Sequence, residues 1–87
     1  MTGDRLPIRV TLLDTLDGHA QVVSSATPVE EIKRAALSRS GIRRPASEYV
    51  VKYRGAELFE GGNTLGDAGV VANAALIVLP RRRIPAR

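Results

Sequence analysis

The sequence predicts a single α+β domain in which one helix packs across a mixed sheet of four to five strands. Three observations support this prediction: an alternating apolar segment near the N-terminus, one clear helix start in the first third of the chain, and a β-branched segment near the end. The 87 residues are enough for one modest core and too few for two. We assign residues 1–80 to the domain and residues 81–87 to a basic tail.

The N-terminal segment predicts a β-hairpin. Asp17-Gly18 is typical of a tight turn between two strands, because both residue types tolerate a positive φ. Residues 21–25 form the predicted returning strand. The first strand is predicted from apolar residues that recur with the period of two of a half-buried strand: Leu6, Ile8, Val10 and Leu12.

A helix is predicted to follow the hairpin. Thr27 can cap its first turn, Pro28 suits the first helical position, and Glu30 completes a capping box by reaching back to the Thr27 amide. Gly41 is placed to end the helix, at about residue 40, in a left-handed conformation. The residues predicted on the buried face of the helix are Val29, Ile32, Ala35 and Ala36.

The second half of the chain predicts three further strands. Residues 48–54 are rich in β-branched and aromatic side chains and predict a strand, which Gly55 ends. Residues 57–59 predict a short strand. Residues 64–68 form a tight helical turn, and residues 75–79 form the last strand, which Pro80 closes. A strand that arrives after so long an excursion commonly lies beside the first strand, which makes the sheet mixed.

The segment from Gly55 to Val70 supports a family resemblance. A glycine turn precedes a short strand, and Thr64-Leu65 followed by Asp67 and Val70 forms the next turn. This pattern resembles the second half of ubiquitin. Residues 27–33 resemble the start of its helix, residues 41–45 resemble the end of that helix, and residues 8–81 align with few gaps. The resemblance implies a ubiquitin-like β-grasp fold and a protein that is bound or attached to others.

The resemblance also implies a docking surface. Ubiquitin presents an apolar patch, and the matching positions here are roughly Leu16, Lys52 and Leu79. We therefore expect partners to bind Val50, Lys52, Ile77 and Leu79, with Leu16 at the rim. The alternative is that these strand residues are simply part-buried. Lys33 matches a chain-forming lysine of ubiquitin, but we expect it to be buried.

The tail departs most from ubiquitin, which ends in Gly-Gly. Residues 80–87 contain no glycine, so the protein is either not conjugated or belongs to a divergent system. Arg81 aligns with a tail arginine that activating enzymes read. We expect the tail arginines to guide the chain end into such an enzyme by pairing with acidic residues; they are Arg81, Arg82, Arg83 and Arg87.

Composition excludes several classes of function. The chain has no cysteine, so no disulfide or thiol nucleophile is possible. The net charge of +4 comes from the tail, because residues 1–80 hold nine basic and nine acidic residues. This argues against a nucleic-acid surface on the domain itself. No signal peptide is evident, and no apolar run approaches the roughly 18 residues that span a bilayer. We expect a cytoplasmic protein without membrane insertion.

No catalytic, cofactor or metal site is predicted. His19 is the sole histidine, and we expect it to be solvated beside the hairpin turn. Asp14 and Asp17 flank that turn and are expected to serve it, and Asp67 is expected to close the turn before Val70. Gly61-Gly62 lacks the Lys-Ser/Thr of a phosphate loop. We expect a protein that is not an enzyme.

Three hypotheses for function remain. The first is a bacterial ubiquitin-like protein modifier that activating and conjugating enzymes recognise; a content of 11 arginines and two lysines suits a GC-rich bacterial genome. The second is a non-covalent adaptor of a secretion system, such as a type VII system, or of another multiprotein complex. The third and weakest is electrostatic binding of nucleic acid by the tail, which an aromatic content of 3% disfavours.

Overall fold

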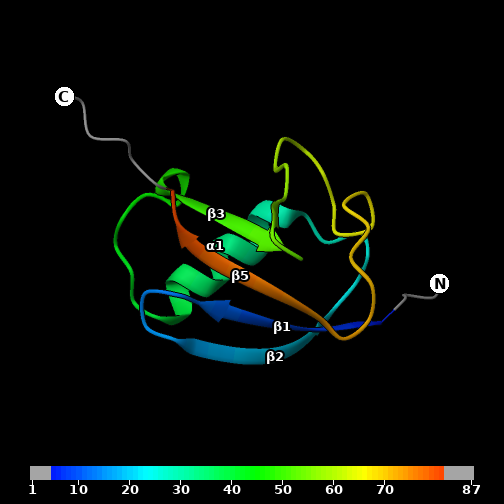
Figure 1. Ribbon diagram of the computed structural model, residues 1–87, viewed down its shortest axis with the longest axis horizontal. Helices are drawn as coiled ribbons and strands as arrows, with labels where there is room; N and C mark the ends of the chain where they lie inside the picture. The colour runs from blue at the N-terminus through cyan, green and yellow to red at the C-terminus, as the bar shows by residue number, and fades with distance from the viewer. Residues whose placement is uncertain (1–4, 82–87) are drawn as a thin grey trace.

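The sheet is mixed and has five strands in the order β2-β1-β5-β3-β4 (Figure 1). The computed structural model describes residues 5–81. β5 (Ala74–Pro80) lies in the middle, parallel to β1 (Leu6–Leu12) and antiparallel to β3 (Tyr49–Tyr53). β2 (Asp17–Val23) and β4 (Ala56–Glu57) form the edges. The prediction that the last strand lies beside the first is confirmed.

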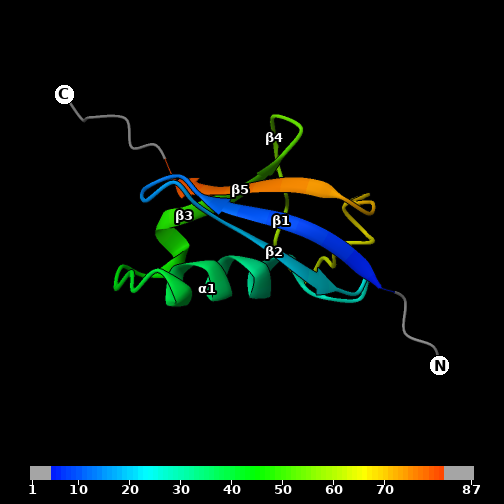
Figure 2. The same cartoon turned by 90° about the horizontal axis from the view of Figure 1, so that it is seen from below.

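One helix and the sheet form two layers. α1 (Val29–Arg39) covers one face of the sheet, and the opposite face, here called the outer face, carries no helix in the described part of the chain (Figure 2). A short 3₁₀ helix, η1 (Ala46–Glu48), precedes β3. Within residues 5–81, no helix has the length and apolar character needed to cross a lipid bilayer.

The hairpin reverses earlier than predicted. Asp17 pairs with Leu12, so Asp17 and Gly18 are the first residues of β2, and the turn comprises residues 13–16. The Leu13 amide donates to the Val78 carbonyl of β5 at 2.9 Å, which extends the β1–β5 ladder beyond Leu12. The turn prediction at Asp17-Gly18 was wrong, because Asp17 and Gly18 already pair with β1; the predicted strand at residues 21–25 overlaps β2 but starts and ends later than β2 does.

The start of α1 differs from the predicted capping box. Pro28 precedes the helix with φ −66° and ψ 143°, and no side chain caps the first turn. Thr27 Oγ1 instead accepts from the Ser24 amide at 3.2 Å. The Val29 amide, one of the donors that a helix leaves unpaired, donates to the Asn63 carbonyl at 3.0 Å. A distant loop therefore replaces the local cap.

The buried face of α1 is also shifted from the prediction. Ala35 is exposed, whereas the buried residues are Val29, Ile32, Lys33, Ala36 and Leu37. The predicted helix end is confirmed: Gly41 has φ 72°, its amide donates to the Ser38 carbonyl, and the Ile42 amide donates to the Leu37 carbonyl. These two hydrogen bonds form a Schellman motif.

The segments after β3 are tight turns around a short edge strand. Arg54 and Gly55 both have positive φ and connect β3 to β4, which ends at Glu57 rather than at residue 59 as predicted. Thr64 and Asp67 close the next turn reciprocally: the Thr64 amide donates to Asp67 Oδ2 and the Asp67 amide donates to Thr64 Oγ1, both at 3.1 Å. The predicted role of Asp67 is confirmed.

The core lies between α1 and the sheet. Its buried members come from every strand except β2 and β4, from α1, from the Thr64–Asp67 turn, and from the segments before and after that turn. Complete burial of each aliphatic side chain in this core contributes about 1.5–3 kcal/mol to the free energy of unfolding. The most completely buried are Tyr49, Leu12, Ile32, Leu65, Leu76, Val29, Val51 and Val78.

Candidate functional site

The outer face of the sheet presents apolar side chains that no helix or strand within residues 5–81 covers (Figure 2). Along β5, the residues that alternate with the core residues Leu76 and Val78 point outward, and Ile77 is 41% exposed. The β3–β5 register places Lys52 opposite Ile77 and Val50 opposite Leu79. The structure therefore brings together the four strand residues that the sequence indicated.

These four residues are not equally accessible. Val50 is only 4% exposed and Leu79 is half-buried, so Val50 supports the surface from below. Leu13, which the sequence reading did not single out, is 46% exposed and lies at the same place. A shallow hollow of about 780 Å³ joins these residues; it is lined by Leu13, Val50, Lys52, Glu57, Leu79, Pro80 and Arg81.

The predicted rim residue Leu16 projects from the turn between β1 and β2. Its side chain is 76% exposed and its φ is 60°, in the region that L-residues other than glycine seldom adopt. Leu16 does not line the hollow that holds Leu13. Leu16 lies in the turn near Leu13 but outside that hollow, so its place at the rim of the surface stays a prediction.

Phe59 is a further exposed apolar side chain that the sequence reading missed. Its neighbour Leu58 is in the core and donates from its amide to the Val51 carbonyl at 2.8 Å, whereas Phe59 is 71% exposed. The ring packs against Gly61, since a Cβ there would lie 3.1 Å from Cζ of Phe59. A signal was available: of two adjacent apolar residues in a short extended segment, only one can face the core.

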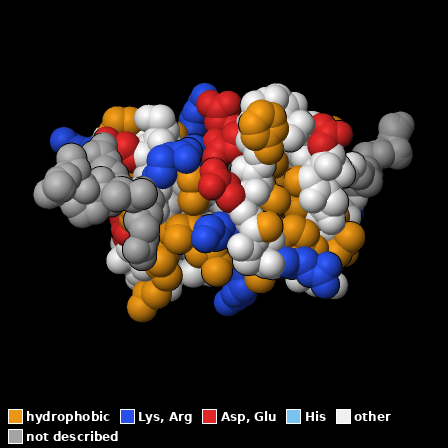
Figure 3. Space-filling view, turned by 45° about the horizontal axis from the view of Figure 1, so that its top comes forward, with side chains coloured by type: hydrophobic (Ala, Val, Ile, Leu, Met, Phe, Trp, Pro, Cys, Tyr) orange, Lys and Arg blue, Asp and Glu red, His pale blue; other side chains and the backbone are white. Residues whose placement is uncertain are grey.

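Phe59 borders the same surface. The hollow that it lines shares Glu57 and Arg81 with the hollow over Val50. We define the docking surface as the apolar residues Leu13, Phe59, Ile77 and Leu79, together with the predicted rim residue Leu16. Figure 3, tilted from the view onto the sheet, shows hydrophobic side chains across this side, Lys and Arg side chains between them, and Asp and Glu side chains toward the top.

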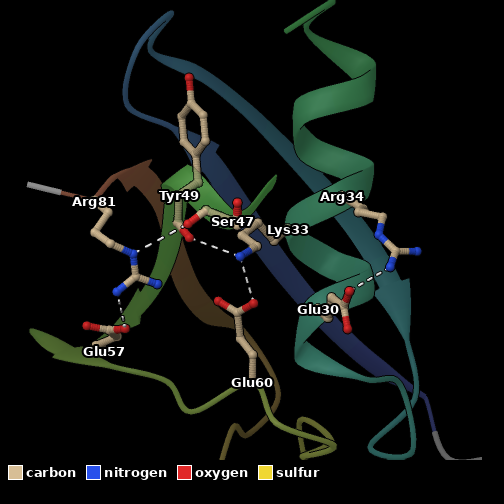
Figure 4. A network of polar contacts seen from close by, with 8 residues as sticks. All are labelled: Glu30, Lys33, Arg34, Ser47, Tyr49, Glu57, Glu60 and Arg81. Atoms are coloured by element: carbon tan, nitrogen blue, oxygen red, sulfur yellow. Dashed lines mark hydrogen bonds and ion pairs between the residues drawn. The ribbon is translucent and has the colours of Figure 1, made fainter. Parts of the chain in front are cut away.

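Arg81, the first residue of the predicted tail, is held against the domain. Its amide donates to the Glu48 carbonyl at 2.6 Å, and its Nε donates to the Ser47 carbonyl at 3.4 Å. Its Nη1 lies 3.7 Å from Glu57 Oε2 (Figure 4). The other predicted tail residues, Arg82, Arg83 and Arg87, lie outside the described residues.

A buried polar network supports the surface from the helix side. Lys33 is 3% exposed; its Nζ lies 2.7 Å from Glu60 Oε1 and donates to the Tyr49 carbonyl at 2.9 Å (Figure 4). The Tyr49 hydroxyl donates to Asp14 Oδ2 at 2.8 Å. Burial, and then the hydrogen bond to and charge of Asp14, raise the pKa of Tyr49, while Arg44 opposes this shift.

The polar residues considered for catalysis have structural contacts. His19 is half-buried within β2 and not beside the turn, because the turn lies at residues 13–16. Asp14 accepts from Tyr49, and Asp17 Oδ2 accepts from the Ser40 hydroxyl at 3.4 Å. In the described range 5–81, no group of three or more His, Asp or Glu side chains is placed to hold a metal ion.

Comparison with known proteins identifies the fold. No protein-family model matches the chain, and no curated protein matches it in sequence. Solved structures do match. The C-terminal ubiquitin-like domain of mouse tubulin-specific chaperone e has a TM-score of 0.78 and 16% identity, over 99% of this chain and 96% of that one.

Two further structures agree. The ubiquitin of Caldiarchaeum subterraneum has a TM-score of 0.73 and 14% identity, over 95% of this chain and 100% of that one. A designed protein based on ubiquitin has a TM-score of 0.74 and 19% identity, over 95% and 96%. At such identities the likeness concerns the fold alone. The chain has the ubiquitin-like β-grasp fold.

Proposed function

We propose that this protein is a bacterial, cytoplasmic ubiquitin-like modifier. Activating and conjugating enzymes would bind its docking surface and attach the protein to targets through its C-terminal tail. One observation supports this most directly: the docking surface and the root of the tail are contiguous. β5 carries Ile77 and Leu79 on its outer face and runs straight into Arg81. One enzyme could therefore hold the surface and guide the tail at the same time.

The chemistry of attachment would come from the enzymes. An activating enzyme would join the tail carboxylate to the AMP part of ATP, with release of pyrophosphate. A nucleophile of the enzyme would then displace AMP. This chain would supply orientation, which lowers the entropic part of the barrier. We propose no catalytic activity for the domain itself; the contacts that already engage Asp14 and Asp17 support this.

A non-covalent adaptor is the second candidate. The observation that favours it is the attachment of Arg81 to Glu48, Ser47 and Glu57, because a tail that threads into an enzyme must be free at its root. An adaptor would use the same docking surface. Its partner would be released by denaturation, whereas a modifier would stay attached.

Intact-mass spectrometry of the protein recovered from its native host separates the two. A covalent adduct, or loss of residues after Leu79, supports a processed modifier. An unmodified chain recovered with a partner that leaves on denaturation supports the adaptor. Recovery of the free, unmodified chain alone contradicts both.

Variants connect that result to the structure. Ile77→Asp places a charge on the outer face of β5, two residues before Leu79, and should abolish attachment or partner recovery. Val71→Asp is the matched control, since Val71 is 60% exposed and lies before β5, outside the strands of the sheet. A variant that ends at Arg81 should lose attachment but keep adaptor binding, and it should also lose any salt-sensitive binding of nucleic acid.

A further inference from the structure

The turn between β1 and β2 is held in place from within the domain. It has two exposed leucines, Leu13 and Leu16, and an exposed turn of this kind orders only if other contacts offset its conformational entropy. Leu13 is fixed at the start of the turn by its hydrogen bond to Val78. Asp14 is fixed by the Tyr49 hydroxyl at 2.8 Å. The Tyr49 hydroxyl therefore ties the turn to the core at Asp14, while the Leu12–Asp17 pair and the bond from the Asp17 amide to Thr15 Oγ1 close the turn at its base.

Tyr49 is well suited to this task. It is the largest of the fully buried side chains, with 0% exposure, so packing fixes the ring and hence the direction of the hydroxyl. Its acceptor is the side-chain carboxylate of Asp14, and hydrogen bonds to charged acceptors are roughly twice as strong as neutral ones. The bond joins residues that are 35 positions apart in the chain.

Tyr49 is also linked, through other residues, to the flank of the docking surface at Phe59. Its carbonyl accepts from Lys33, and Lys33 pairs with Glu60, which is adjacent to Phe59 (Figure 4). Leu58 fixes the other side of Phe59 through its hydrogen bond to Val51. The two exposed flanks, Leu16 and Phe59, are thus tied to the same buried residue by different atoms.

We propose that Tyr49 is a positioning residue, which holds the turn at residues 13–16 and, through Lys33 and Glu60, the loop at Phe59 in the geometry that a partner binds. This inference rests on the proposed function, because a preformed surface matters only if it is a docking surface. A surface that is already ordered in the free protein binds more tightly, because association then costs less conformational entropy.

The first test is backbone relaxation by NMR on the full chain. Tyr49→Phe keeps the ring and removes only the hydroxyl, so the core should remain packed. Amide order parameters at residues 14–16 should fall from about 0.85 to below about 0.6. Those at residues 59–62 should not change, because the carbonyl of residue 49 remains. Tyr53→Phe is the control and should leave both segments unchanged.

Glu60→Ala tests the other flank, because it removes the acceptor of Lys33, and unchanged order parameters at residues 59–62 would overturn this part of the proposal. It should lower the order parameters at residues 59–62 and leave residues 14–16 as they are. Unchanged order parameters at residues 14–16 in Tyr49→Phe would overturn the proposal. A decrease spread evenly over all strands would overturn it too, because Tyr49 would then be a general stability residue.

Binding is then measured against the partner protein that the host experiment identifies. Tyr49→Phe should weaken affinity by about three- to tenfold, mainly through faster dissociation, as is usual among variants of one interface. Unchanged affinity would contradict the positioning role even if the turn becomes mobile. Failure to recover any bound or attached protein rejects the proposed function. The order parameters test the role of Tyr49 in holding the turn whether or not a partner is found.

Discussion

The pair formed by Lys33 and Glu60 allows a prediction in which the two partners are not equivalent. The Lys33 side chain is 4% exposed, whereas that of Glu60 is 19% exposed. Removing Glu60 leaves a buried ammonium with a single acceptor, the Tyr49 carbonyl, for its three donors. Removing Lys33 leaves a carboxylate that can still reach water.

The magnitudes follow from this difference in burial. Loss of one member of a fully buried ion pair costs about 3–5 kcal/mol. Because Glu60 is at the margin, we expect Glu60→Ala to lower the free energy of unfolding by about 2–3 kcal/mol. Lys33→Met keeps the aliphatic stem and removes the buried charge, but it also removes the donor to the buried Tyr49 carbonyl, so it should cost about 1–2 kcal/mol, less than Glu60→Ala.

The assay is urea denaturation, supported by thermal unfolding. For a domain of this size, about 1 kcal/mol corresponds to a shift in Tm of 4–8 °C, so Glu60→Ala should lower Tm by roughly 10–20 °C. Glu30→Ala is the control: it breaks the exposed pair with Arg34, whose side chains are 67% and 49% exposed, and should cost about 0.5 kcal/mol or less. Equal losses for Glu60→Ala and Glu30→Ala would refute the reasoning, as would a larger loss for Lys33→Met.

Three other substitutions have distinct expected outcomes. The folded-state pKa of Tyr49 is raised above its ordinary value of 10.0. The stability that this shift contributes is therefore complete below pH 10.0 and is lost as the pH rises through the folded-state pKa. Denaturant titrations at alkaline pH should show that the free energy of unfolding falls less steeply with pH in Tyr49→Phe. Asp67→Ala removes the carboxylate that accepts from the Thr64 amide and keeps the bond from the amide of residue 67 to Thr64 Oγ1. It should cost about 1 kcal/mol of unfolding free energy by urea denaturation, and no loss would contradict a stabilising role of the Asp67 carboxylate. Leu16→Gly relieves a positive φ and should leave stability unchanged or raise it by about 1 kcal/mol, while partner binding weakens; a clear loss of stability would contradict this.

Local signals in the sequence located most elements of the fold. The period of two in residues 6–12, the stop at Gly41 and the β-branched segments at residues 48–54 and 75–79 correspond to β1, the end of α1, β3 and β5. Such signals succeed where side-chain periodicity and backbone conformation are determined by neighbouring residues. They also identified the outward residues of β5, because alternation along a strand assigns a face to each residue.

What only the tertiary structure decided involves contacts between distant segments. Asp17 and Gly18 pair with β1 instead of forming the hairpin turn, and the Asn63 carbonyl replaced the cap expected from Thr27. The exposure of Phe59 and the burial of Val50 likewise depend on which segments lie beside them. The sequence by itself determined most of the elements, their order and the alternation of faces along β1 and β5. The tertiary structure decided where those elements end and which side chains a partner can reach, because hydrogen bonds and burial between distant segments outweigh local turn and capping preferences.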